Sequence, residues 1–194
     1  DFLKDIASEI DREKEIIDDL LMLTRMDNSV STLNISLVNI NTLVERMLKK
    51  LTPLANEKNI EIVYESMRDI EAEVDDIKLT QVVTNLVENA IKYNVPGGKV
   101  IVTLNADIDS FFLRIQDTGI GIPEEHQKNI FQRFYRVDKA RSRETGGTGL
   151  GLSIVDSIIS SHGGQIKVVS KPVSDGEKFG ETVFTIKIPL KHKK

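Results

Sequence analysis

Residues 81–94 of this chain read QVVTNLVENAIKYN. Apolar residues recur at steps of three and four from Leu79 onward, which predicts an amphipathic helix. The opposite face of this helix carries polar side chains, namely Gln81, Asn85, Glu88, Asn89 and Lys92. Asparagine is a poor helix former, and a face that only meets water would use Glu, Lys or Ala at a lower free-energy cost. Two asparagines one helical turn apart therefore suggest amide oxygens that face a bound ligand.

A glycine-rich segment, GGTGLGLS at residues 146–153, runs into a second helical pattern. The G-x-G-x-G spacing at the start of a helix lets backbone N–H groups surround phosphate oxygens, assisted by the positive end of the helix dipole. The segment matches neither the G-x-G-x-x-G of a Rossmann unit nor the Gly-Lys-Ser/Thr of a Walker A loop. A flexible glycine loop without a ligand is the alternative.

A second glycine-rich segment, DTGIGIP at residues 117–123, follows a predicted strand at residues 111–116. An ionised carboxylate only accepts hydrogen bonds, so Asp117 suits a ligand that presents an amino group. Adenine offers its exocyclic amine, whereas guanine would place a carbonyl oxygen against the carboxylate, so this contact favours ATP over GTP. Gly119 and Gly121 remove side chains where the base must approach. Taken alone, this segment is most simply a turn between two strands, and only the neighbouring motifs favour a site.

These segments, together with FQRFYRVD at residues 131–138, resemble the ATP-binding domain of sensor histidine kinases in the GHKL ATPase superfamily. That family carries an N box, a first glycine box, an F box and a second glycine box, and all of them occur here in that order. The resemblance covers about residues 36–190. It implies that the chain binds ATP and Mg²⁺ and transfers the ATP γ-phosphoryl group to a histidine.

The resemblance also implies roles for individual residues. Asn89 is the expected Mg²⁺ ligand, and its neutral oxygen suits an ion that keeps several waters and bridges phosphates. An acid at the position of Glu88 activates water in related ATPases, whereas the nucleophile in histidine kinases is an imidazole. The residues expected to take part in catalysis are Glu88, Lys92, Arg133 and Arg136. The expected ATP-binding residues are Asn85, Asn89, Lys92, Tyr93, Asp117, Gly119, Gly121, Ile122, Gly147, Thr148, Gly149, Leu150 and Gly151.

Residues 123–146 form a long polar connection between the glycine boxes, and a connection of that length predicts a mobile lid. Between Pro123 and Gly147 six Lys/Arg residues stand against four Asp/Glu residues. Phe131 and Phe134, three residues apart, predict a short helix packed against the domain, with Arg133 and Arg136 on its open side. A basic lid could neutralise charge on a transferred phosphoryl group. A solvated charged loop is the alternative.

The order of the remaining elements predicts the fold class. Strands are expected at residues 37–40, 60–65, 72–74, 100–104, 111–116, 165–170 and 182–188. Further helices are expected from an Asn41 cap to about residue 56, and from the second glycine box to His162. Strands and helices interleave without regular βαβ repetition. This predicts an α+β, two-layer α/β sandwich in which helices cover one face of a mixed sheet, preceded by one long amphipathic helix.

The same patterns divide the chain into segments. Residues 1–28 resemble the second helix of a dimerisation hairpin, because apolar residues follow a heptad-like register, although packing on its own domain is the alternative. Residues 29–35 are expected to be a linker, residues 36–190 the catalytic domain and residues 191–194 a basic tail.

Composition limits the remaining classes. The chain has 194 residues, a formal net charge of −4 and no cysteine, so thiolate catalysis and cysteine zinc sites are excluded. The charge gives no reason to expect a nucleic-acid partner. No apolar run approaches the roughly 18 residues of a spanning helix. We expect a cytoplasmic domain whose full-length parent is anchored in a membrane.

The phosphoacceptor box of the family, H-E-x-x-[R/K]-T-P, does not match any of the three histidines. The chain is therefore not expected to phosphorylate itself, and His162, beside Gly163, is expected to cap a helix. Expected partners are the phosphoacceptor hairpin of the same or a sister protomer and the receiver domain of a response regulator, with a homodimeric parent. The alternatives are a self-contained GHKL-type ATPase and a nucleotide-sensing module without chemistry.

Overall fold

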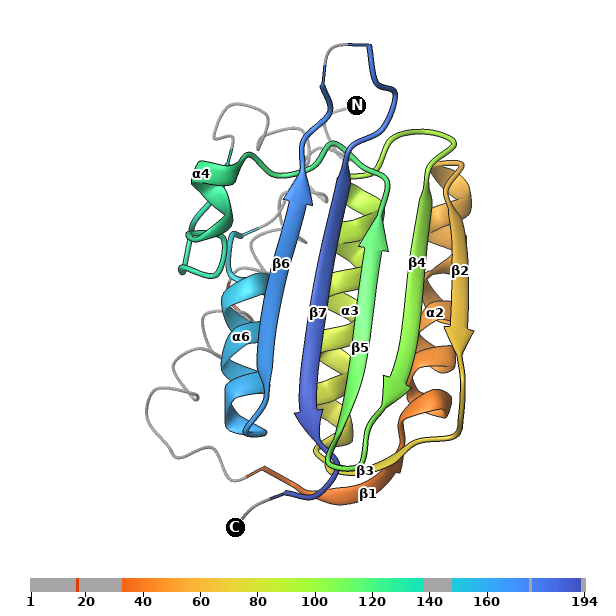
Figure 1. The fold of residues 1–194 in the computed structure, drawn as a ribbon, viewed down its shortest axis with the longest axis vertical. Coiled ribbons are helices and arrows are strands. Elements are labelled where there is room, and N and C mark those ends of the chain that lie inside the picture. The colour runs from red at the N-terminus through yellow and green to blue at the C-terminus, as the bar shows by residue number, and fades with distance from the viewer. Residues whose placement is uncertain (1–16, 18–32, 138–147, 175, 193–194) are drawn as a thin grey trace.

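A computed structural model describes residue 17 and residues 33–137, 148–174 and 176–192 (Figure 1). The chain runs through β1 (Ser36–Asn39), α2 (Ile40–Glu57), β2 (Glu61–Ser66), β3 (Glu71–Val74), α3 (Asp76–Lys92), β4 (Lys99–Ala106), β5 (Ser110–Asp117), α4 (Glu124–Gln127), α6 (Gly151–Ser161), β6 (Gln165–Lys171) and β7 (Glu181–Pro189). Apart from residue 17, the predicted helix at residues 1–28 lies outside the described residues, as does most of the predicted linker.

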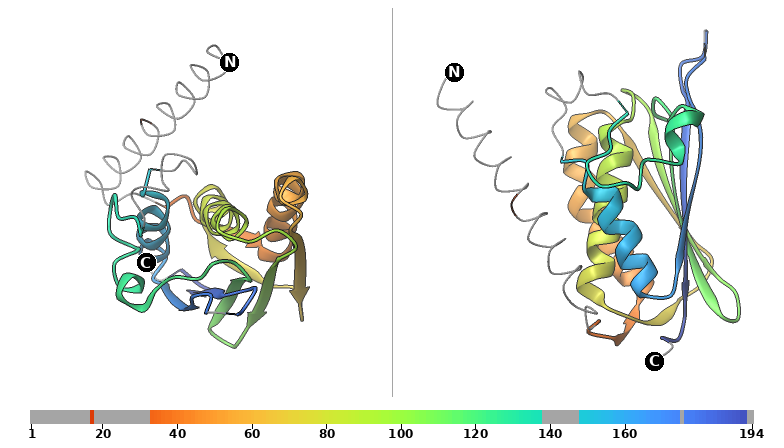
Figure 2. Two further views of the ribbon diagram at one scale, coloured as in Figure 1. Left: turned by 90° about the horizontal axis from the view of Figure 1, so that it is seen from above. Right: turned by 90° about the vertical axis from the view of Figure 1, so that its left-hand side faces the viewer.

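The strands form a mixed sheet of five strands and a small sheet of two. The large sheet has the order β2-β4-β5-β7-β6, in which β2 and β4 are parallel and the other neighbours are antiparallel. β1 and β3 form the small antiparallel sheet at the other end of the domain from the β6–β7 loop. Helices α2, α3 and α6 all cover one face of the large sheet (Figure 2). The predicted two-layer α+β sandwich is therefore confirmed.

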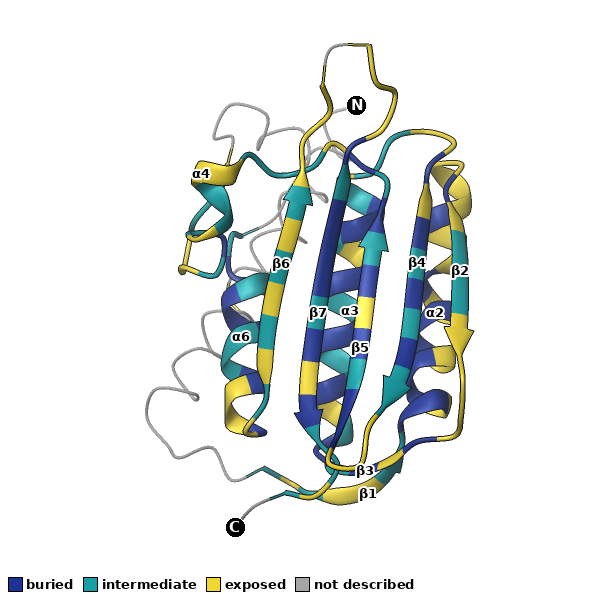
Figure 3. Cartoon of the chain, in the orientation of Figure 1, coloured by how far each residue is buried: buried dark blue, intermediate teal, exposed yellow. Residues whose placement is uncertain are grey.

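The core lies between the helices and the covered face of the sheet. Residues of β4 and β5 alternate between that face and the open one, which Figure 3 shows as dark blue positions separated by lighter ones. The apolar stripe of α3 is buried as its spacing predicts, through Leu79, Val82, Val83, Leu86, Val87, Ala90 and Ile91. Burying this stripe fixes the helix rotation, so that its polar residues are carried on other faces.

The start of α2 differs from the prediction. Asn39, not Asn41, is the N-cap, and its Oδ1 accepts a hydrogen bond from the backbone N–H of Thr42 at 2.8 Å. Asn41 is buried and tethers the β2–β3 connection, because its Nδ2 donates to Arg68 O at 3.0 Å and its Oδ1 accepts from Ile70 N at 2.9 Å. Either asparagine suits a cap by residue type, and tertiary contacts decide between them.

His162 ends α6 and joins it to the start of α3. Its backbone N–H bonds the carbonyls of the last turn, which confirms the predicted capping position. Its Nε2 accepts the Asp75 backbone N–H at 3.0 Å, and its Nδ1 lies 2.7 Å from Ile158 O. Nδ1 therefore carries the proton, and burial lowers the pKa of His162 against the opposing effect of the Ile158 carbonyl.

No helix among the described residues is long and apolar enough to cross a membrane.

Candidate functional site

The predicted site residues gather at the end of the sheet where β5 ends and where α6 begins, the upper end in Figure 1. α3 brings Asn85 and Asn89 to this end, both half-buried. A Cβ atom added at Gly151 would lie 3.4 Å from Asn85 Oδ1, so the asparagine face of α3 lies against the second glycine box. Neither amide side chain makes a hydrogen bond to any of the described residues. Their oxygens can therefore accept a ligand or a hydrated ion.

Asp117 is the last residue of β5 and is 4% exposed. Its Oδ1 accepts a hydrogen bond from the Gly119 N–H at 2.9 Å. Burial raises the pKa of Asp117 to about 7, the Gly119 N–H opposes this rise, and the negative charge of Glu181 adds to it. A buried carboxylate without a compensating donor is costly, so an amino group of a ligand would stabilise its ionised form.

The first glycine box is held between the end of α3 and the end of β6. The Ile120 N–H donates to Tyr93 O at 3.0 Å, and a Cβ atom at Gly119 would lie only 2.3 Å from that same carbonyl oxygen. Gly121 has φ +71°, and a Cβ atom there would lie 2.3 Å from Lys171 O. These positions need glycine because neighbouring backbone occupies the space of a side chain.

Among the described residues, no side chain caps the start of α6. Leu150 precedes the helix, and no described side chain accepts from its first N–H groups. Thr148 Oγ1 accepts the Leu150 N–H at 3.1 Å, which orders the turn before the helix. Uncapped N–H groups at a helix start suit a phosphate group. Gly147, which the sequence assigns to the same site, lies outside the described residues.

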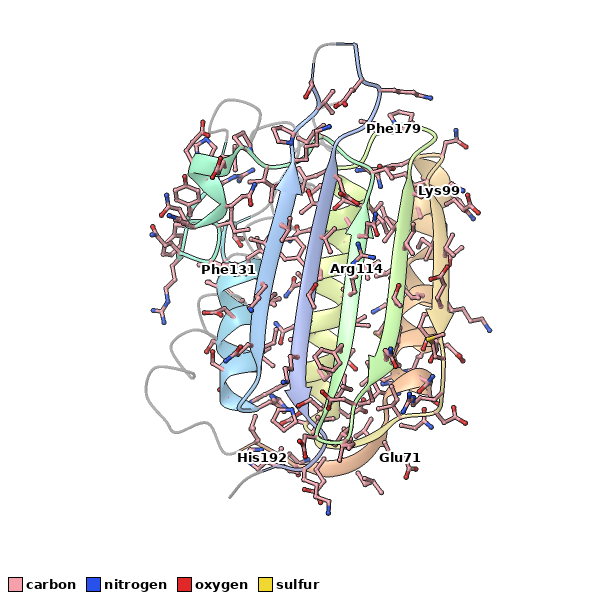
Figure 4. All side chains as sticks on the ribbon, in the orientation of Figure 1. Glu71, Lys99, Arg114, Phe131, Phe179 and His192 are labelled. Atoms are coloured by element: carbon pink, nitrogen blue, oxygen red, sulfur yellow. The ribbon has the colours of Figure 1, made fainter. Side chains whose placement is uncertain are left out.

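The F box differs from its prediction. Only α4 (Glu124–Gln127) is helical between Pro123 and Val137, and the segment of Phe131 and Phe134 consists of turns. Phe131, labelled in Figure 4, packs edge-on against Phe184 with ring centroids 6.3 Å apart. Phe134 instead has φ +62° and is 59% exposed. The Phe134 N–H donates to Gly149 O at 3.0 Å, so the F box contacts the second glycine box through its backbone.

The remaining predicted residues surround this end of the domain less tightly. Lys92 ends α3, and its Nζ lies 5.4 Å from the centroid of the Tyr93 ring. Tyr93 itself is 41% exposed. Glu88 and Arg133 are exposed, and Arg136 is half-buried. The catalytic roles of Glu88, Lys92, Arg133 and Arg136 stay predictions.

Two further residues at this end of the sheet, Ser170 and Gln127, belong to none of the sequence motifs. Ser170 lies on the covered face of β6, where the preceding positions of that face, Ile166 and Val168, are apolar. Gln127 ends α4. A polar residue at an inward strand position was the signal that could have identified Ser170.

Comparison with known proteins gives the family. The family described as histidine kinase-, DNA gyrase B- and HSP90-like ATPases matches residues 74–192. The sensor histidine kinase RppB of Synechocystis sp. is 37% identical over 180 residues, which cover 92% of this chain and 38% of RppB. The sensor histidine kinase WalK of Bacillus subtilis is 35% identical over 168 residues, 85% of this chain and 27% of WalK. The chain thus spans between 27% and 38% of the length of these two relatives.

Solved structures agree with the sequence relatives. The match to the catalytic domain of histidine kinase ThkA covers 81% of this chain and 97% of the ThkA chain, with 29% identity and a TM-score of 0.69. The match to full-length ShkA, solved in complex with AMPPNP, covers 99% of this chain and 39% of the ShkA chain, with 25% identity and a TM-score of 0.82. The chain therefore belongs to the family of histidine kinase-, DNA gyrase B- and HSP90-like ATPases, and within it to the sensor histidine kinase catalytic domains.

Proposed function

We propose that this chain binds ATP with Mg²⁺ and transfers the γ-phosphoryl group to a histidine of a dimerisation helix. The observation that carries the proposal is the buried Asp117 at one side of a glycine-lined site and the uncapped start of α6 at the other. Asp117 receives the amino group of adenine, and the N–H groups of α6 and the second glycine box receive the phosphates. Asn85 and Asn89 lie on α3 beside them.

The donor set fits a magnesium ion that arrives with its nucleotide. No group of three or more His, Asp or Glu side chains among the described residues could hold a metal by itself. Mg²⁺ commonly uses one or two protein oxygens together with phosphates and waters, and the Asn89 amide oxygen is available for this role. Bound there, the ion would neutralise charge on the phosphates.

Phosphoryl transfer needs an attacking imidazole nitrogen in line with the γ-phosphorus. The new bond forms between that nitrogen and phosphorus, the bond from phosphorus to the β–γ bridging oxygen breaks, and ADP leaves. Lys92, Arg133 and Arg136 are the cations that would stabilise the charge on the transferred group.

We further propose that the partners are a phosphoacceptor hairpin and a response regulator receiver domain. ThkA solved in complex with the response regulator TrrA supports this, since that structure covers 97% of this chain with 26% identity and a TM-score of 0.73. The parent protein is then a homodimer in which hairpins pair.

The chain mixed with γ-labelled ATP and the dimerisation hairpin of its parent is expected to label the histidine of the hairpin. Labelling should be slow, because the two parts are not linked and in-line placement depends on encounter. The chain alone should acquire no acid-labile phosphate. Asn89→Ala should remove the transfer while the variant keeps the unfolding free energy of the parent within about 1 kcal/mol, because the amide makes no hydrogen bond to a described residue.

Strong labelling of the isolated chain would show that one of its own histidines is the acceptor. Steady release of inorganic phosphate without any acceptor would instead assign the chain to the self-contained ATPases.

A further inference from the structure

Two side chains outside every recognised motif hold the backbone of Ile122 from both sides. Ser170 Oγ accepts the Ile122 N–H at 2.8 Å, and Gln127 Nε2 donates to Ile122 O at 2.8 Å. Ile122 directly follows Gly121 and is itself packed against the core. The backbone of Ile122, within the first glycine box, is thus fixed by side chains from β6 and α4, which we call the Ser170–Gln127 clasp.

The Ser170 hydroxyl has no unused hydrogen-bonding capacity. It donates to Glu181 O at 2.6 Å and lies 3.0 Å from Thr182 Oγ1. A hydroxyl has one proton and two acceptor sites, so the Ile122 N–H and the Thr182 hydroxyl fill both of the acceptor sites. Thr182 is the register partner of Asp117 in the β5–β7 ladder. Ser170 therefore joins the glycine box to the strand that lies beside Asp117.

Gln127 completes the clasp with its second amide proton. Its Nε2 also donates to Ser170 O at 2.8 Å, so one amide nitrogen bridges Ile122 and β6. Both amide hydrogens are then used, and an isosteric carboxylate could supply neither of them. Both side chains are half-buried and uncharged, so the contacts are shielded in part from water and not screened by salt.

The local backbone explains why such a clasp is needed. Gly119 and Gly121 have no side chains, so backbone hydrogen bonds hold this part of the turn. The Ile120 N–H donates to Tyr93 O at 3.0 Å, and Ile120 O accepts the Val173 N–H at 3.1 Å. The clasp fixes the end that leads to α4.

We propose that Ser170 and Gln127 are positioning residues for nucleotide binding. They hold the first glycine box in the conformation that receives adenine beside Asp117, and they act through Ile122 without contacting the nucleotide. This inference rests on the proposed binding of ATP at this end of the domain.

Calorimetric titration in the presence of Mg²⁺ measures the affinity of a non-hydrolysable ATP analogue for the parent chain, for Ser170→Ala and for Gln127→Glu. Each variant should bind the analogue about tenfold more weakly, the scale of one lost hydrogen bond of this kind. Hydrogen exchange at the Ile122 amide should become faster in Ser170→Ala. Ser170→Thr, which keeps the hydroxyl, should restore most of the affinity.

Ser66→Ala is the matched control. Ser66 Oγ also bridges two segments, accepting from Asn41 Nδ2 at 2.7 Å and donating to Arg68 O at 3.0 Å, but it lies at the other end of the sheet. Ser66→Ala should lower the free energy of unfolding by about as much as Ser170→Ala does, and it should leave the affinity for the analogue unchanged.

The outcomes separate the two proposals. If the parent itself does not bind the analogue, the proposed function fails and the clasp has no nucleotide to position. The parent chain can instead bind the analogue while Ser170→Ala and Gln127→Glu bind it as tightly as the Ser66→Ala control does. The clasp then has only a structural role, and the inference is overturned. Should Ser170→Ala not fold, Gln127→Glu alone decides the outcome, since it preserves size and shape.

Discussion

Replacing Asp117 by asparagine is expected to stabilise the nucleotide-free chain above about pH 7 while it weakens ATP binding by about 2 kcal/mol or more. The two effects have one cause. In the absence of nucleotide, the buried, ionised carboxylate lacks the amino group that would stabilise its charge. Asparagine keeps an acceptor for the Gly119 N–H, which lies 2.9 Å from Asp117 Oδ1, but it has no charge to bury. Its amide also cannot replace a carboxylate as partner of the adenine amino group with equal strength.

The sign of the stability effect follows from the pKa. The pKa of Asp117 is raised in the folded chain from 3.8 to about 7, mainly by burial. The folded state therefore holds a proton that the unfolded state has lost, and this stabilising contribution is complete below 3.8 and is lost as the pH rises through about 7. The advantage of Asp117→Asn over the parent should grow across that window.

Urea unfolding of both chains at about pH 5 and about pH 8 measures this difference. Asp107→Asn is the control, because backbone N–H groups of Asp109 and Ser110 lower the pKa of Asp107 from 3.8, so its carboxylate is ionised at both pH values. Its effect on stability should therefore be the same at the two pH values. A stability difference for Asp117→Asn that stays constant with pH would contradict the assignment of a buried, protonatable carboxyl.

The second large effect is expected at Gly121. Alanine there meets two penalties, since φ is +71° and the added Cβ would lie 2.3 Å from Lys171 O and 2.5 Å from Pro172 Cα. The first costs about 1 kcal/mol. The second requires a backbone shift of the kind that costs about 1–3 kcal/mol. Because the shift falls on the box beside Asp117, nucleotide affinity should decrease with stability.

Gly163→Ala separates the two penalties. Gly163 has φ +69°, but no heavy atom lies within 4 Å of the added Cβ. Urea unfolding should therefore show the cost of the left-handed backbone alone for Gly163→Ala and at least twice that cost, roughly 2 kcal/mol or more, for Gly121→Ala. Equal losses in the two variants would show that the backbone of Lys171 yields without cost.

The sequence predicted those parts of the fold that depend on local periodicity. The apolar stripe of α3 identified its buried face, and each strand from β2 to β7 lies within a few residues of its predicted position. It could not predict features that depend on distant partners. The choice of Asn39 over Asn41 as cap depends on Ser66, Arg68 and Ile70, which hold the Asn41 amide.

The site shows the same division. Asp117 and the glycines were identified from motifs with fixed residue types at fixed spacing, and their roles in nucleotide binding stay predictions. The helix expected around Phe131 and Phe134 was wrong, since a spacing of three fits a helix and a turn equally, and the backbone contact of Phe134 with Gly149 selects the turn. Ser170 and Gln127 were missed because their partner Ile122 is 48 and 5 residues away.

Calorimetric titration of the chain with ATP and with GTP, both in the presence of Mg²⁺, tests whether Asp117 selects the base. Asp117, buried at the end of β5, should favour adenine, which carries an amino group at the ring position where guanine carries a carbonyl oxygen. ATP should bind, and GTP should bind at least about tenfold more weakly, because its carbonyl oxygen would leave the carboxylate unpaired. Equal affinity for the two nucleotides would show that Asp117 does not select the base, and no binding of either would contradict the proposed nucleotide site.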